Sequence, residues 1–305
     1  MTDPGKTIGI VGAGAVGHTL ATVLTVLPWC SRLLVASGSR ASARALVTDV
    51  EDMAQVLGSP LRVEAVKPSA MTLCDAIVIC PRAPFTNTST TEIRMAGLVA
   101  NAPVIAALGR QLTSYEGTVI VVTNPVDVMT RLFTETSRVR RVYGVGSATD
   151  SARYRLTLAR LLAVPVERVA GRVVGEHGDA AVVCASTTRV ASRPTTVPLA
   201  AVHEELSARP RRINAGLGRT RCGPAGAVLA ALTHTLGLVD GTLELSAVNP
   251  SGSCLGTPLQ FTAGVPTVAM PDLSGREQAL LAAADQKTRT AYQLIAHHAE
   301  GADAS

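Results

Sequence analysis

The stretch Ile8-Gly-Ile-Val-Gly12-Ala-Gly14-Ala-Val-Gly17 decides the fold, because an apolar run leads directly into a Gly-x-Gly-x-x-Gly pattern. Between a strand and a helix, this pattern is typical of a turn that holds a dinucleotide. Gly12 permits the tight turn, Gly14 lets the backbone approach a pyrophosphate, and Gly17 lets the helix pack closely on the strand. A purely structural glycine turn is the alternative. The cofactor-binding residues predicted from this stretch are Gly12, Gly14, Ala15, Val16 and Gly17.

Similar apolar runs recur along the first half of the chain and suit fully buried parallel strands. They cover Thr7–Val11, Arg32–Ala36, Leu61–Val66, Ala76–Cys80 and Thr118–Val122. Helix-length segments separate several of these runs. The pattern predicts an α/β fold with a Rossmann-type, doubly wound parallel sheet.

The second half has a different pattern, which predicts an α+β substrate domain. We expect helices at 149–162, near 199–213 and 224–237, and at about 274–298, with β-rich pieces at 169–190 and 242–248. The length of 305 residues suits two domains. We place a dinucleotide-binding domain at residues 1–146 and a substrate and catalytic domain at 147–305.

The composition excludes several classes of function. Hydrophobic residues make up 47% of the chain and charged residues 17%, which predicts a large core and no global disorder. Arg supplies all but three of the 28 basic residues, without a dense basic run, so we expect no nucleic-acid partner.

No apolar stretch is long enough to span a membrane, and the first residues lack a signal-peptide pattern. Six cysteines without metal-binding spacing predict buried free thiols, no metal site and a cytoplasmic location.

The segment after the second predicted strand bears on the choice of cofactor. An NAD-preferring site usually has an acidic residue there that binds the ribose hydroxyl. This chain instead has Ser37, Ser39 and Arg40, which could donate hydrogen bonds and a positive charge to a 2′-phosphate. We therefore predict that NADP is preferred and that NAD is possible. A polar surface loop that binds NAD weakly is the alternative.

Two further motifs carry groups suited to the reduction of a ketone. Asp150-Ser-Ala-Arg153 places an acid and a guanidinium on one helix face, and Gly175-Glu-His177-Gly-Asp179 presents a histidine between two glycines. Hydride transfer to a ketone needs a proton donor, a cation that polarises the carbonyl and an anchor for the substrate carboxylate. These residue types supply all three.

The motifs stand in the order and spacing of a known family, and the resemblance covers essentially the whole chain. Gly12-Ala-Gly-Ala-Val-Gly17, Thr123-Asn-Pro-Val-Asp127, Asp150-Ser-Ala-Arg153 and Gly175-Glu-His-Gly-Asp179 resemble the lactate/malate dehydrogenase family. The resemblance implies NAD(P)-dependent interconversion of a 2-oxo acid and its L-2-hydroxy acid. It also implies a homodimer or homotetramer.

The resemblance also implies roles for individual residues. His177 is the expected acid/base, Asp150 orients it and favours its protonated form, and Arg153 anchors the substrate carboxylate. Arg94 matches the arginine of the family's mobile loop, which polarises the carbonyl, although the stretch from Pro84 to Arg94 is about three residues longer than usual. The secondary candidates are Asn124, which would contact nicotinamide and substrate, and Thr220, which would line the pocket.

The chain departs from the family where malate dehydrogenases carry a second loop arginine, because it has Phe85 or, if the insertion falls earlier, Thr88. Arg82 replaces a common glycine, and Arg219 and Arg221 flank Thr220. These cations would suit a substrate with an anionic tail, and Arg82 is a candidate substrate-binding residue. Scattered surface or interface arginines are the competing explanation, and Arg82 could also reach the cofactor pyrophosphate.

We therefore expect an NADP-preferring 2-oxo acid reductase. The alternatives are an NAD-using lactate dehydrogenase, a catalytically silent nucleotide-binding regulator, and an NAD-dependent glycoside hydrolase that would need a metal.

Overall fold

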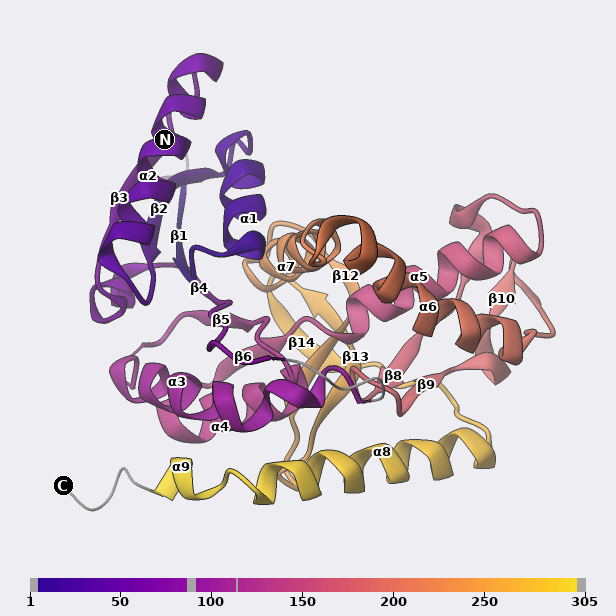
Figure 1. Ribbon diagram of the computed structural model, residues 1–305. Helices are drawn as coiled ribbons and strands as arrows, with labels where there is room; N and C mark the ends of the chain where they lie inside the picture. The colour runs from indigo at the N-terminus through magenta and orange to yellow at the C-terminus, as the bar shows by residue number, and fades with distance from the viewer. Residues whose placement is uncertain (1–4, 87–91, 114, 301–305) are drawn as a thin grey trace.

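The computed structural model describes residues 5–86, 92–113 and 115–300. A parallel region with strand order β3-β2-β1-β4-β5-β6 forms its first part (Figure 1). The strands are β1 (Lys6–Val11), β2 (Cys30–Ala36), β3 (Arg62–Ala65), β4 (Ala76–Ile79), β5 (Thr118–Val121) and β6 (Arg141–Gly144). The order reverses between β1 and β4, so the turn after β1 lies at the switch point where such sheets bind ligands. The predicted α/β fold and the five predicted strands are confirmed.

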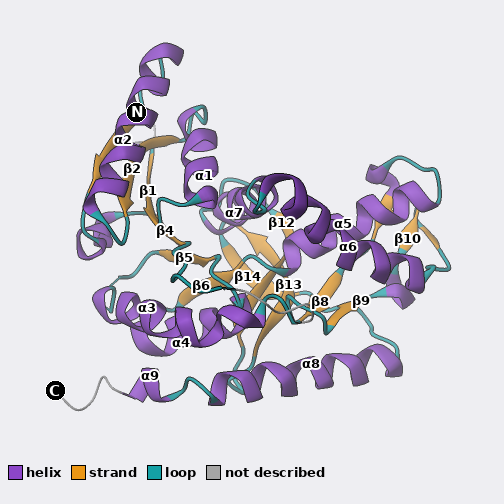
Figure 2. Cartoon of the chain, in the orientation of Figure 1, coloured by secondary structure: helices purple, strands orange, loops and turns teal. Residues whose placement is uncertain are grey.

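Helices cover both faces of this parallel region (Figure 2). Successive strand residues point to opposite faces, and both faces are apolar, so each face packs against its own layer of helices. Ile8, Ile10 and Val78 pack in the core beneath α1 and α2, whereas Ile77 and Ile79 pack in the core beneath α3 and α4. The helices are α1 (Ala15–Thr25), α2 (Arg40–Leu57), α3 (Leu98–Gln111) and α4 (Val126–Ser137). Short 3-10 helices lie at Pro68–Leu73 (η1) and Met95–Gly97 (η2).

The second half extends the same sheet with antiparallel strands, in the order β6-β12-β13-β8-β9, and β14 pairs with β13. These strands are β12 (Gly241–Val248), β13 (Cys254–Thr262), β14 (Val265–Val268), β8 (Val173–Gly175) and β9 (Ala181–Val183). A separate small sheet contains β7 (Val169–Ala170), β10 (Arg189–Val190) and β11 (Arg193–Pro194). A division between residues 1–146 and 147–305 stays a prediction, and the two parts share one sheet through the pairing of β6 with β12.

The remaining helices complete the second half. They are α5 (Ser147–Leu161), η3 (Val166–Arg168), η4 (Ala185–Thr187), α6 (Leu199–Leu217), α7 (Cys222–Thr235), α8 (Gly275–Gln293) and α9 (His297–Glu300). Sequence analysis predicted one final helix at about 274–298, but the structure interrupts it after Gln293. The long α8, yellow in Figure 1, packs against α4, β8 and β9. This packing brings the C-terminal helix close to the loop that carries His177.

Two smaller predictions concern membrane-spanning segments and the cysteines. In the part of the chain that the structure describes, no helix is both long and apolar enough to cross a membrane. All six cysteines are free thiols. Four are buried and Cys80 is half-buried, but Cys222 is exposed at the start of α7, so the prediction of buried thiols was wrong at this position.

Candidate active site

The glycine turn after β1 fits a bound pyrophosphate. Gly12 adopts a φ of +123°, and a Cβ there would lie 2.8 Å from the backbone of Cys80 and Pro81. A Cβ on Gly17 would lie 1.9 Å from the Gly12 carbonyl oxygen, whereas a Cβ on Gly14 would meet nothing within 4 Å. Gly12 and Gly17 thus bring strand and helix together, and the space beside Gly14 stays open. The first turn of α1 has N–H groups without intrahelical acceptors, which suit an anion.

The segment after β2 lies beside this turn, because the Gly12 N–H donates to the Ala36 carbonyl over 2.8 Å. Ser39 is the N-cap of α2, and its Oγ accepts a hydrogen bond from the Ser42 N–H at 3.0 Å. Arg40 is exposed and has no ion-pair partner in the described part of the chain. Ser37 is half-buried, and none of residues 37–40 carries a carboxylate.

The predicted catalytic groups meet around one carboxylate, Asp150. Its Oδ2 lies 2.6 Å from His177 Nδ1, and its Oδ1 lies 3.4 Å from Arg153 Nη1 and 3.6 Å from Arg94 Nη2. Asp150 and Arg153 are one turn apart on α5, His177 follows β8, and Arg94 directly precedes η2. The structure therefore joins residues from three separate segments into one acid, imidazole and guanidinium cluster.

Burial and neighbouring charges together determine the protonation of this cluster. Burial acts to raise the pKa of the Asp150 carboxyl, but the charges of His177, Arg94 and Arg153 hold that pKa well below its usual range. Burial and the charge of Arg94 lower the pKa of His177, while Asp150 acts in the opposite direction. The expectation that Asp150 favours the imidazolium is correct for its direction, but the other two effects outweigh it. The cluster thus contains an ionised Asp150 and a histidine that gives up its proton readily.

Asp127, to which sequence analysis gave no role, supports the backbone of His177. Its Oδ2 accepts the His177 N–H at 2.7 Å, and its Oδ1 accepts the Ser246 Oγ–H at 2.5 Å. A Cβ on Gly146 would lie 2.3 Å from His177 Cβ, so this glycine makes room for the histidine. Burial raises the pKa of Asp127 to about 7, against the effect of its hydrogen bonds. The signal in the sequence was an acid at the start of a helix, inside a motif already singled out.

Asn124 follows β5 and is exposed at the carboxyl edge of the sheet. Its carbonyl oxygen accepts a hydrogen bond from Asn101 Nδ2 at 2.8 Å, and Asn101 Oδ1 accepts the Ala83 N–H at 2.9 Å. Buried Asn101 therefore holds the loops after β4 and β5 together. Within the described part of the chain, the exposed Asn124 side chain makes no hydrogen bond and is available to a ligand.

Among the described residues, no hydrogen bond or ion pair joins the predicted specificity residues to the Asp150 cluster. Arg82 is exposed, and its Cζ lies 4.2 Å from the centroid of the Phe85 ring. Burial and the nearby charge of Arg219 lower the pKa of Arg82. Thr220 is half-buried between α6 and α7, and in the described residues it makes no side-chain hydrogen bond to the Asp150 cluster. Thr88 and the middle of the stretch from Pro84 to Arg94 lie outside the described residues.

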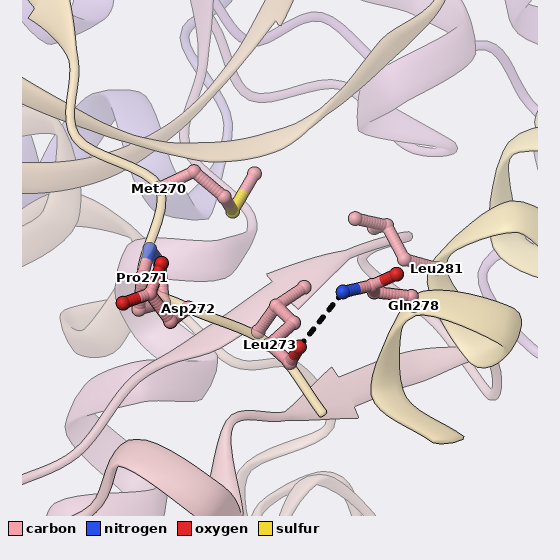
Figure 3. A pocket seen from close by; sticks show the side chains of 6 residues that line it. All are labelled: Met270, Pro271, Asp272, Leu273, Gln278 and Leu281. Atoms are coloured by element: carbon pink, nitrogen blue, oxygen red, sulfur yellow. Dashed lines mark hydrogen bonds between the residues drawn. The ribbon is translucent and has the colours of Figure 1, made fainter. Parts of the chain in front are cut away.

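A surface cavity of about 460 Å³ lies elsewhere, at the connection from β14 to α8 (Figure 3). Gln278 and Leu273, joined by a hydrogen bond of 2.8 Å, form part of its wall. None of the predicted site residues lines it. Across residues 5–86, 92–113 and 115–300, no group of three or more His, Cys, Asp or Glu residues is placed to hold a metal ion.

Comparison with known proteins agrees with this geometry. Residues 6–144 match the family described as lactate/malate dehydrogenase, NAD binding domain. The L-lactate dehydrogenase of Deinococcus radiodurans is 30% identical over 288 residues, which cover 89% of this chain and 93% of that protein. The malate dehydrogenase of Haloferax volcanii is 32% identical over 238 residues, which cover 73% of this chain and 76% of that protein.

The fold is also that of solved structures. The crystal structure of Cryptosporidium parvum malate dehydrogenase superposes with a TM-score of 0.87, covering 96% of this chain and 99% of that one at 22% identity. The likeness therefore extends from the dinucleotide-binding half through the antiparallel half. The chain belongs to the lactate/malate dehydrogenase family and is an NAD(P)-dependent 2-hydroxy acid dehydrogenase.

Proposed function

We propose that this protein reduces a 2-oxo acid to the L-2-hydroxy acid with NADPH and catalyses the reverse reaction. The observation that carries the proposal is the contact of 2.6 Å between His177 Nδ1 and Asp150 Oδ2, beside Arg153 and Arg94. The contact engages one ring nitrogen with the carboxylate, so Nε2 remains to donate to a substrate oxygen. The L configuration rests on the family resemblance.

Each group in the cluster has a distinct task. Gly12, Gly14 and Gly17 would hold the pyrophosphate of the dinucleotide, whose nicotinamide would supply or receive the hydride. Protonated His177 gives its proton to the ketone oxygen, and Asp150 stabilises the ring in its charged form. Arg153 holds the substrate carboxylate through two parallel hydrogen bonds, and Arg94 polarises the carbonyl. The family resemblance implies that Asn124 orients the nicotinamide and the substrate oxygen and that Thr220 lines the pocket.

The charge of the substrate would tune the acid. In the free protein, burial and Arg94 depress the pKa of His177. A bound carboxylate offsets the positive charges of Arg153 and Arg94, so the pKa of His177 should rise when substrate binds. We therefore expect kcat/KM for hydroxy acid oxidation to fall as the pH drops through a value below the usual range of histidine. The corresponding inflection in kcat for reduction should lie at higher pH, which a pair of pH profiles would measure.

The preference for NADP rests on Ser37, Ser39 and Arg40 at the end of β2. A guanidinium and hydroxyl groups favour a 2′-phosphate, whereas an acid at this place would repel it. We expect a higher kcat/KM with NADPH than with NADH, and Arg40→Ala should reduce that ratio. Arg62→Ala is the control, because Arg62 is exposed at the opposite, amino-terminal end of the parallel strands. An NADH rate equal to the NADPH rate, unchanged by Arg40→Ala, would show an NAD-using enzyme.

An anionic substrate tail is supported by Arg82 and Arg219. Their guanidiniums are close enough for like-charge repulsion, and neither has a carboxylate partner among the described residues. We propose that they favour a 2-oxo acid with a second carboxylate, a phosphonate or a sulfonate. A panel of pyruvate, apolar 2-oxo acids, oxaloacetate, phosphonopyruvate and sulfopyruvate tests this. Equal turnover of substrates with neutral and anionic tails would refute the preference for an anionic tail but not the proposed reductase activity. NADPH binding without any turnover would indicate a catalytically silent regulator.

We further propose that the protein acts in the cytoplasm as a homodimer or homotetramer. The assembly rests on the family resemblance, and the location rests on free cysteines. Light scattering of the purified protein would measure its mass in solution.

A further inference from the structure

Lys287 on α8 connects two segments of the active site that are far apart in the sequence. Its Nζ lies 2.6 Å from Glu92 Oε2 and 2.7 Å from Glu176 Oε2. Glu92 lies two residues before Arg94, and Glu176 directly precedes His177. One ammonium group therefore bridges the segment of the proposed polarising arginine and the segment of the proposed acid/base.

Glu176 needs this counter-charge because it is 2% exposed. A buried carboxylate without a partner is costly, and one that is paired and hydrogen-bonded is tolerated. Glu176 Oε2 also accepts the Ala180 N–H at 2.8 Å, and a Cβ on Gly178 would lie 2.4 Å from Oε1. The hydrogen bonds to Glu176 and Glu92 raise the pKa of Lys287 although burial acts to lower it, so the lysine carries its charge.

The segment from Glu92 to Arg94 contacts other parts of the site through both of its end residues. The Glu92 N–H donates to Asp179 Oδ2 at 3.0 Å, and Arg94 Nη2 lies 3.6 Å from Asp150 Oδ1. Glu92 has a φ of +50°, a left-handed conformation that side-chain-bearing residues adopt only where surrounding contacts hold them. Lys287 and Asp179 supply those contacts, so the placement of Arg94 depends on them.

We propose that Lys287 is a positioning residue, which holds Arg94 in place through Glu92 and neutralises Glu176 beside His177. The inference rests on the proposed roles of Arg94 and His177. Lys287 forms ion pairs with Glu92 and Glu176 and acts on Arg94 and His177 only through them. The charged groups around His177 are Asp150 and Arg153 from α5, Arg94 before η2, Asp127 from α4, and Glu176 and Asp179 from its own loop.

Lys287→Met should separate positioning from simple structural support. Without the ammonium, the buried charge of Glu176 favours the imidazolium, so the pH inflection of His177 should move to higher pH. Loss of Arg94 placement should lower kcat on the order of 10- to 100-fold, since small misplacements of catalytic groups have effects of this size. KM should change little because Arg153 still holds the carboxylate. Arg276→Met on the same helix is the control, because Arg276 is exposed and unpaired among the described residues.

Three further variants divide the two effects. Glu92→Gln should lower kcat and, by releasing Arg94, raise the inflection less than Lys287→Met does, because Lys287 still neutralises Glu176. Lys287→Arg should restore both measurements. Glu176→Gln combined with Lys287→Met should return the inflection toward its original pH. Titration of the His177 ring by NMR measures that inflection without turnover, which distinguishes failure of this inference from failure of the proposed reaction.

A Lys287→Met protein with the His177 inflection and the kcat of the Arg276→Met control would overturn the proposal. If Lys287→Met does not fold, Glu92→Gln decides the Arg94 part. An unchanged kcat in that variant would contradict it.

Discussion

Asp150→Asn tests whether the charge of this carboxylate, and not only its hydrogen bond, drives proton transfer. The amide is nearly isosteric and can still accept from His177 Nδ1, which lies 2.6 Å from Oδ2. The variant therefore removes the charge and keeps the geometry. Two unit charges about 4 Å apart interact by about 4 kcal/mol at an effective dielectric constant of about 20, which corresponds to a loss of about 10³-fold in rate.

The assay is the initial rate of NADPH oxidation over a range of 2-oxo acid concentrations. We expect kcat/KM for reduction to fall about 10³-fold. KM should rise little, because Arg153 and Arg94 lose a competing carboxylate and stay available to the substrate. Asp52→Asn is the control, since Asp52 is exposed on α2. A fall of less than about tenfold, with the fold intact by circular dichroism, would refute the assignment of Asp150 as the charge that stabilises the imidazolium.

Four other substitutions test the same geometry. Arg153→Lys should raise KM about 10- to 100-fold in steady-state assays, because hydrogen bonds to charged groups contribute about 1.5–3 kcal/mol and lysine cannot form the paired fork. Gly17→Ala should destabilise the fold by about 1–3 kcal/mol in thermal unfolding, whereas Gly14→Ala should keep the Tm and weaken NADPH binding. Burial raises the pKa of Asp127 from 3.8 to about 7, so the folded form disfavours its carboxylate. The free energy of unfolding should therefore decrease as pH rises across that range, and Asp127→Asn should lack this contribution in denaturant titrations; an unaltered slope would contradict it.

Local patterns in the sequence were sufficient for much of the fold. Buried parallel strands read as continuous apolar runs, and β1 to β5 were therefore predicted. The hairpin of β13 and β14 was not predicted, although its two strands are adjacent in sequence; β13 also pairs with β8, which is distant in sequence. The short β6 was also not predicted.

The sequence by itself determined the glycine turn and the pairing of Asp150 with Arg153. Both depend on short spacings, since residues three apart on a helix share a face whatever surrounds them. Only the tertiary structure decided that His177 meets Asp150, that Asp127 supports His177, and that Lys287 reaches Glu176 across 111 positions of the chain. Such contacts depend on how sheet and helices pack. A lone lysine on an amphipathic helix carries no signal of the buried carboxylate it will neutralise.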